Sequence, residues 1–123
     1  MKLAMVFPGQ GSQSVGMMKG FADTPVVEDT FREARDIVGI DYWQMAAEGP
    51  AEALNQTVNT QPLMLVAGVA CWRAWQEKGG PMPAYFAGHS LGEYTALVAS
   101  GALRFEDALP LVRFRAQAMQ VAV

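Results

Sequence analysis

The sequence predicts an α/β fold with a short, mainly parallel sheet, and three observations lead to this prediction. An apolar segment at 3–7 ends at Pro8-Gly9, as a short buried strand does. A second apolar segment at 84–88 runs into residues 88–92, which have the G-x-S-x-G pattern of a strand, a sharp turn and a helix. The sequence between these segments has mostly helical patterns, and this order of elements is typical of α/β domains.

The first helix is predicted to begin at Thr24-Pro25, with threonine as the N-cap, and to end at Gly39. Its apolar positions recur at helical spacing, at Val27, Phe31, Ala34 and Val38. Residues 42–56 follow as short helical pieces around Gly49-Pro50.

A central helix is predicted from Thr60-Gln61-Pro62 to Gly79-Gly80. Its apolar run at 63–72 is about half as long as a membrane span, so we expect a buried core helix rather than a membrane segment. Cys71 lies in this run and is expected to be a buried free thiol.

A short helix is expected after the turn, to about Ser100, and a last helix from about Phe105. This last helix keeps its helical pattern to Val123 without a glycine, asparagine or proline that would end it. We therefore expect residues 1–123 to be part of one domain, truncated inside a helix.

The composition excludes several classes of function. The chain has 123 residues, a hydrophobic fraction of 51% and a net charge of −3, which indicates a globular domain without a bulk basic surface for nucleic acid. The single cysteine has no partner for a disulfide or a metal site. The absence of a targeting segment and the free thiol are compatible with a cytoplasmic protein.

Ser90 is the candidate nucleophile, since the turn of a G-x-S-x-G elbow exposes its hydroxyl. The alternative is a capping box, in which Ser90 caps the next helix and Glu93 reaches back to it. That alternative leaves Gly92 unexplained, because glycine in a helix costs about 1 kcal/mol relative to alanine. His89, the only histidine, is expected to point away from Ser90 and to pack, or to bond to backbone, behind the elbow.

Arg115 is the one charged residue on an otherwise apolar face of the last helix, formed with Ala108, Leu111, Val112, Ala118 and Met119. One interpretation is a buried salt bridge with an acidic side chain such as Asp107 or Glu93. The other is a fork for a substrate carboxylate, which a guanidinium matches in shape and charge.

The loop Gly9-Gln10-Gly11 follows the first strand at the sheet edge where the elbow lies. Its backbone N–H groups, together with that of Leu91, would suit an oxyanion. An ordinary glycine turn explains its spacing equally well.

Four segments, at 6–13, 60–62, 88–94 and 113–119, resemble in order and spacing the bacterial malonyl-CoA:acyl-carrier-protein transacylases. These belong to the acyltransferases of fatty-acid and polyketide synthesis. The resemblance covers the whole chain, and the family continues beyond it. It implies an α/β-hydrolase-like large subdomain, of which residues 1–123 are the N-terminal part. The family's ferredoxin-like small subdomain and its downstream catalytic histidine are absent from this chain.

The resemblance implies that Ser90 carries the malonyl group and that Arg115 holds its free carboxylate. Gln10 and Leu91 would supply the oxyanion N–H groups, and Gln61 would lie near the site. The reaction would move malonyl from malonyl-CoA to acyl carrier protein, in the cytoplasm, without a bound cofactor or metal. An esterase or thioesterase with the same elbow, and a non-catalytic fragment that binds carrier protein or CoA, are the alternatives.

Overall fold

A two-stranded parallel sheet with helices on one face confirms the predicted α/β class. The structure, a computed structural model, describes residues 2–122. In register, Ala4 of β1 pairs with Tyr85 of β2, and Phe7 pairs with Gly88. The elements in chain order are β1 (Ala4–Phe7), η1 (Lys19–Phe21), α1 (Pro25–Val38), α2 (Tyr42–Glu48), α3 (Ala51–Leu54), α4 (Thr57–Glu77), β2 (Tyr85–Gly88), α5 (Gly92–Ala99) and α6 (Phe105–Ala122).

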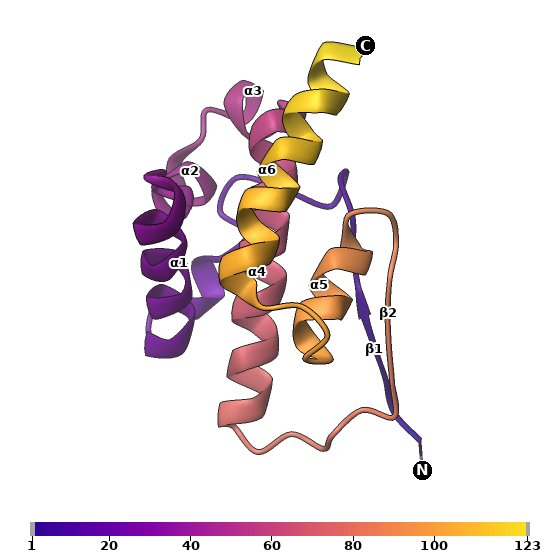
Figure 1. Ribbon diagram of the computed structural model, residues 1–123. Helices are drawn as coiled ribbons and strands as arrows, with labels where there is room; N and C mark the ends of the chain where they lie inside the picture. The colour runs from indigo at the N-terminus through magenta and orange to yellow at the C-terminus, as the bar shows by residue number, and fades with distance from the viewer. Residues whose placement is uncertain (1, 123) are drawn as a thin grey trace.

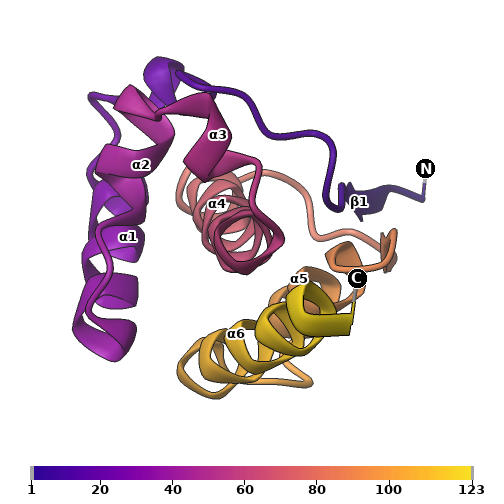
Figure 2. The ribbon, with the colours of Figure 1, turned by 90° about the horizontal axis from the view of Figure 1, so that it is seen from above.

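The central helix α4 organises the packing. It contacts α1 on one side and α5 and α6 on another, and α5 separates α6 from the sheet (Figure 1, Figure 2). Nearly every residue of its apolar run is buried, which confirms the expected core helix. Cys71 is the exception to the expectation, because its position on α4 is exposed rather than buried.

Most predicted helix boundaries are confirmed, and that of α4 is corrected. Helix α1 begins at Pro25 and ends before Gly39, whose φ of 77° is the left-handed value that favours glycine. Helix α4, in contrast, begins at Thr57, so Pro62 lies inside it instead of opening it. The carbonyl of Gln56 accepts the N–H groups of Asn59 and Thr60 and starts the helix early. Pro62 then removes only one intrahelical hydrogen bond.

The buried face of α6 also differs from the predicted one. Of the predicted face, Ala108 and Val112 are buried, while Leu111, Ala118 and Met119 are exposed. The buried stripe consists of Phe105, Ala108, Leu109, Val112 and Ala116. Packing against α1 and α4 rotates the stripe toward Leu109 and Ala116, which leaves Arg115 half-buried at its border.

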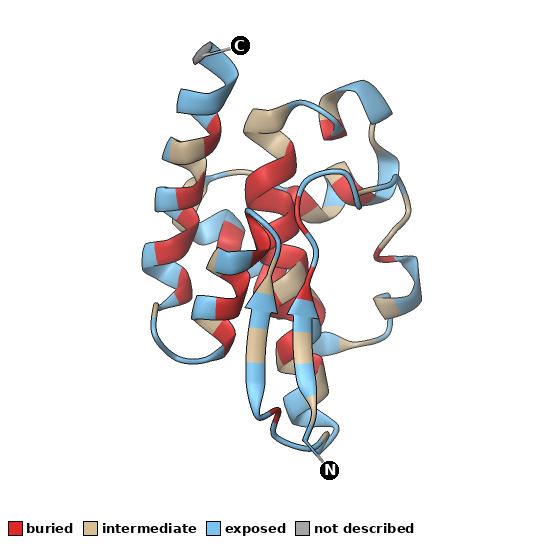
Figure 3. Ribbon diagram, turned by 90° about the vertical axis from the view of Figure 1, so that its right-hand side faces the viewer, coloured by how far each residue is buried: buried red, intermediate tan, exposed pale blue. Residues whose placement is uncertain are grey.

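The sheet presents one face to the helices and one to the outside (Figure 3). Phe7 and Phe86 point inward, and the Phe86 ring meets Trp72 of α4 edge-on at 5.1 Å between centroids. Val6 and Tyr85 on the other face are 68% and 58% exposed. The strands are therefore buried on one side only, whereas the sequence predicted buried parallel strands.

No helix among residues 2–122 is long and apolar enough to cross a membrane.

Candidate active site

Ser90 lies at a sharp turn between β2 and α5, at the carboxyl end of the sheet. Its φ of 54° makes it the one non-glycine residue with a left-handed backbone among those that the structure describes. Such a conformation is strained for a residue with a Cβ and is held here by neighbouring structure. The N–H of His89 donates to the carbonyl of Phe7 at 3.2 Å, and the N–H of Gly92 donates to the carbonyl of His89 at 2.9 Å.

The two glycines of the elbow are required by close backbone crossings. A Cβ on Gly88 would lie 2.0 Å from the carbonyl carbon of Gly92, and one on Gly92 would lie 2.2 Å from the carbonyl oxygen of Phe7. The capping-box interpretation is wrong, because no side chain caps α5 and Ser90 is not in the extended conformation of an N-cap. Because Gly92 has no Cβ, the carboxyl end of β1 can lie directly against the turn.

Replacing Gly92 by alanine is expected to lower the free energy of unfolding by about 1–3 kcal/mol, the usual cost of overpacking. The contact is with backbone, which cannot move aside as a flexible side chain can. Urea unfolding of the complete polypeptide measures this loss of stability. By the complete polypeptide we mean the product of the full reading frame that encodes this chain. Gly20→Ala is the matched control, since a Cβ there meets nothing within 4 Å. Equal stability of the Gly92→Ala and Gly20→Ala variants would contradict the close approach of the β1 backbone to Gly92.

Arg115 reaches Ser90 from α6. Its Nη2 donates to Ser90 Oγ at 3.2 Å and its Nη1 donates to Gln61 Oε1 at 2.6 Å. Its guanidinium carbon lies 5.5 Å from the centroid of the Tyr94 ring, in a cation–π arrangement. The salt-bridge interpretation of Arg115 is wrong: Asp107 pairs with Arg104, and no carboxylate among the described residues pairs with Arg115.

Gln61 fixes the orientation of that guanidinium. Its side chain is 1% exposed, its Oε1 faces Arg115, and its Nε2 donates to Met119 Sδ at 3.1 Å. A buried amide with both ends bonded cannot turn freely. The structure thus brings together Ser90, Gln61 and Arg115, three residues from separate sequence segments.

Gln10 and Leu91 flank the elbow. A Cβ on Gly9 would lie 2.5 Å from the carbonyl oxygen of His89, so the loop after β1 presses against the turn. Within residues 2–122, neither the N–H of Gln10 nor that of Leu91 donates to a protein acceptor. Free backbone N–H groups at an elbow of this kind are donors of the type that can bind a developing oxyanion.

His89 precedes Ser90 in the elbow, and its side chain makes no hydrogen bond to Ser90 Oγ. Its side chain is exposed beside Gly9, while its backbone N–H donates to the carbonyl of Phe7 in β1 and its carbonyl accepts the N–H of Gly92. The His89 ring makes no hydrogen bond among the described residues and is exposed, so neither the expected packing nor the expected bonding of this side chain to backbone is found. Among the described residues Ser90 Oγ has Arg115 as its only hydrogen-bond partner, and no histidine or carboxylate contacts it. No cluster of metal-binding side chains occurs in this part of the chain either.

Sequence reasoning assigned no role in the site to Tyr94 and Met119. Tyr94 follows Ser90 by four residues, and Met119 follows Arg115 by four residues. Residues four apart share one face of a helix, so this spacing was an available signal for Met119, which lies with Arg115 in α6. Ser90 precedes α5, so no helical spacing links it to Tyr94. Both side chains help to hold the guanidinium, Tyr94 directly and Met119 through Gln61.

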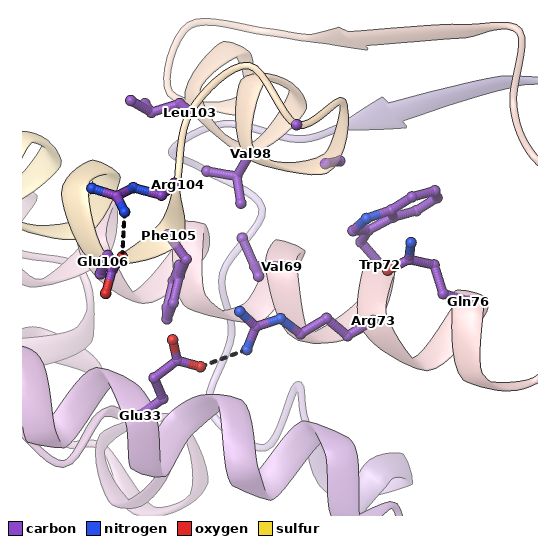
Figure 4. Close-up of a pocket in the computed structure, with 12 residues that line it drawn as sticks. Glu33, Val69, Trp72, Arg73, Gln76, Val98, Leu103, Arg104, Phe105 and Glu106 are labelled. Atoms are coloured by element: carbon purple, nitrogen blue, oxygen red, sulfur yellow. Dashed lines mark hydrogen bonds and ion pairs between the residues drawn. The ribbon is translucent and has the colours of Figure 1, made fainter.

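A separate hollow of about 480 Å³ lies between α4, the end of α5 and the start of α6 (Figure 4). Its cations are already paired: Arg73 bonds Glu33 at 2.7 Å and lies over the Phe105 ring, and Arg104 bonds Glu106 at 3.3 Å. These contacts join α1, α4 and α6, so the hollow is a place of helix packing.

Comparisons with known proteins agree with this geometry. The family described as "Acyl transferase domain" matches residues 4–123. A malonyl CoA-acyl carrier protein transacylase of Salmonella typhimurium is 56% identical over 123 residues, covering 99% of this chain and 40% of that protein. The crystal structure of an acyl-carrier-protein S-malonyltransferase from Burkholderia pseudomallei has 66% identity and a TM-score of 0.97, covering all of this chain and 40% of the other.

A third relative is a malonyl-transacylase solved in complex with a type II polyketide acyl-carrier protein. It is 54% identical with a TM-score of 0.96, again over all of this chain and 40% of that one. The chain thus spans about two-fifths of the length of these relatives. The match over nearly all of its residues shows that this chain belongs to the acyl transferase domain family.

Proposed function

We propose that this chain carries the nucleophile and the malonyl-binding side chains of a malonyl-CoA:acyl-carrier-protein S-malonyltransferase. The observation that carries the proposal is the hydrogen bond from Arg115 to Ser90 Oγ at 3.2 Å. The carboxylate of a malonyl thioester is separated from the reacting carbonyl by one methylene carbon. A guanidinium beside the nucleophile is therefore within reach of that carboxylate.

In the first half-reaction Ser90 Oγ attacks the thioester carbonyl of malonyl-CoA. The new C–O bond sends an electron pair to the carbonyl oxygen, which the N–H groups of Gln10 and Leu91 stabilise. This electron pair then re-forms the C=O double bond as the C–S bond to CoA breaks. CoA leaves as a thiol with the proton that Ser90 gave to a general base. Within the resemblance, this base is the family's histidine downstream of Val123.

In the second half-reaction the phosphopantetheine thiol of acyl carrier protein attacks the malonyl-serine ester, and Ser90 regains its proton. The relative solved with a carrier protein supports this acceptor. The reaction exchanges acyl groups between thioesters, so it needs no permanent cofactor and no metal. We place it in the cytoplasm, as the resemblance implies.

Residues 1–123 form, in this proposal, the N-terminal part of an α/β-hydrolase-like subdomain. The family's ferredoxin-like subdomain lies outside this part. The observed parallel sheet with a nucleophile elbow at the carboxyl end of β2 supports the assignment.

The fate of the acyl group tests the proposal. The complete polypeptide is incubated with malonyl-CoA, and its mass and peptides are measured before and after addition of holo acyl carrier protein. We expect a malonyl adduct on the peptide that contains Ser90, which the carrier protein then removes as malonyl-carrier protein.

Two other outcomes correspond to the alternatives. Release of malonate to water, with little transfer to carrier protein, would indicate an esterase or thioesterase. Binding of CoA or carrier protein without any adduct would indicate a non-catalytic binding module.

A further inference from the structure

We infer that Thr57, at the first position of α4, is a positioning residue that holds the Gln10 loop in place for the oxyanion. This inference rests on the proposed function, in which the N–H of Gln10 binds the oxyanion. Thr57 is far from the elbow in sequence, and it touches none of the reacting groups. It acts through the side chain of Gln10, whose Nε2 donates to Thr57 Oγ1 at 2.9 Å.

The loop at 9–13 has little packing to hold its tip. Gln10, Gly11 and Ser12 are all exposed, and Gly11 has a φ of 113°, a conformation open to glycine. Its base is fixed, because Gly9 lies against the carbonyl of His89. The next backbone anchor beyond the tip is the hydrogen bond from the N–H of Gly16 to the carbonyl of Ala46, at 2.7 Å.

Between these anchors the loop is held by side-chain amides. The N–H of Gly11 donates to Gln13 Oε1 at 2.7 Å, and Gln13 Nε2 donates to Asn55 Oδ1 at 2.8 Å. Together with the bond from Gln10 to Thr57, these contacts tie the loop at two points to the turn between α3 and α4.

The first turns of α4 are also tied to the helix that carries Arg115. The N–H of Val58 donates to Gln120 Oε1 at 3.2 Å, and Gln61 Nε2 donates to Met119 Sδ. The start of α4 is thus a common anchor. The loop at 9–13 is attached to the start of α4 on one side. The part of α6 that carries Arg115 is attached to it on the other side.

Thr57 differs from Gln61 in what it holds. Gln61 contacts the guanidinium that would bind substrate, so its loss affects binding. The Thr57 hydroxyl holds only the loop whose N–H meets charge that develops in the transition state. Its loss is therefore expected to slow acylation while leaving the affinity for malonyl-CoA unchanged.

The test compares Thr57→Val, which removes the hydroxyl at constant shape, with Thr57→Ser, which keeps it. In the complete polypeptide, the single-turnover rate of malonyl-Ser90 formation is measured as a function of malonyl-CoA concentration. For Thr57→Val we expect the saturating rate to fall about 3- to 10-fold, the range of one hydrogen bond, with an unchanged half-saturation concentration. Thr57→Ser should retain the rate of the parent.

A double-mutant cycle with Gln10→Met shows whether loss of the bond from Gln10 to Thr57 causes the slower acylation. Methionine removes the side-chain amide of Gln10 but keeps the backbone N–H that would bind the oxyanion. Gln10→Met should slow acylation as Thr57→Val does, and the double variant should be no slower than either single one. Thr24→Val is the control, since the Thr24 side chain makes no capping bond at α1 and lies in another element. It should acylate like the parent.

Acylation of Thr57→Val at the parental rate would overturn the inference, and so would equal slowing in Thr57→Ser. An additive double variant would also overturn it. If Thr57→Val does not fold, Gln10→Met decides alone: a lower saturating rate at unchanged half-saturation supports the inference, and a parental rate refutes it. Failure of the parent itself to form the adduct would instead refute the proposed function.

Discussion

Replacing Ser90 by alanine is expected to abolish the malonyl adduct and to lower malonyl transfer by about 10⁵- to 10⁶-fold, as for other nucleophile knockouts. The reason is chemical, since alanine cannot form the ester through which the group passes. The backbone strain at Ser90, with φ at 54°, remains in the variant, so the elbow itself should survive. Intact-mass analysis after incubation with malonyl-CoA, and transfer to holo acyl carrier protein, measure the two effects.

Ser100→Ala is the matched control, because Ser100 is an exposed serine at the other end of α5 whose hydroxyl bonds only the carbonyl of Leu97. It should be acylated at Ser90 like the parent. A malonyl adduct that persists in Ser90→Ala, or one that maps to another peptide of the parent, would refute the nucleophile assignment.

Local signals predicted the helices where both ends are set by neighbouring residues. Helix α1 begins at Thr24-Pro25 and ends at Gly39, because a proline at the first position and a left-handed glycine act within one turn. The start of α4 was mispredicted because Pro62 was taken as its opening residue, whereas the carbonyl of Gln56 accepts the first helical N–H groups. The N–H of Val58 is in addition satisfied by Gln120, sixty-two residues later, which no local signal shows. Which face of α6 is buried depends likewise on α1 and α4, and the pattern of α6 alone cannot specify it.

The same distinction applies to the site. Ser90 is visible in sequence because the elbow needs glycines at fixed spacing on either side. Arg115 was noticed as a lone cation on an apolar helical face, and Gln61 was noticed through the resemblance as a motif residue. The hydrogen bond between them depends on the tertiary structure and could not be predicted from either segment. Nothing in the sequence around Thr57 indicates its proposed role, since that role depends on a hydrogen bond from Gln10, in the distant loop after β1.

Replacing Arg115 by alanine is expected to reduce the preference for malonyl-CoA over acetyl-CoA by about 10- to 150-fold. This range corresponds to about 1.5–3 kcal/mol for a hydrogen bond to a charged group, and acetyl has no carboxylate to form one. The variant also leaves the buried Gln61 oxygen without its partner, which should slow both substrates to a similar degree. The ratio of the two kcat/KM values in the complete polypeptide therefore isolates recognition of the carboxylate from the general loss.

Two further variants of α6 sharpen this test. Arg113→Ala removes a cation two residues away, on a different side of the helix, and should leave the malonyl to acetyl ratio unchanged. Arg115→Lys keeps the charge but not the planar fork that reaches Ser90 and Gln61 together, so it should recover only part of the ratio. An Arg115→Ala variant that loses malonyl and acetyl transfer equally would mean that the guanidinium serves to hold Gln61 and Tyr94 in place rather than to select the substrate.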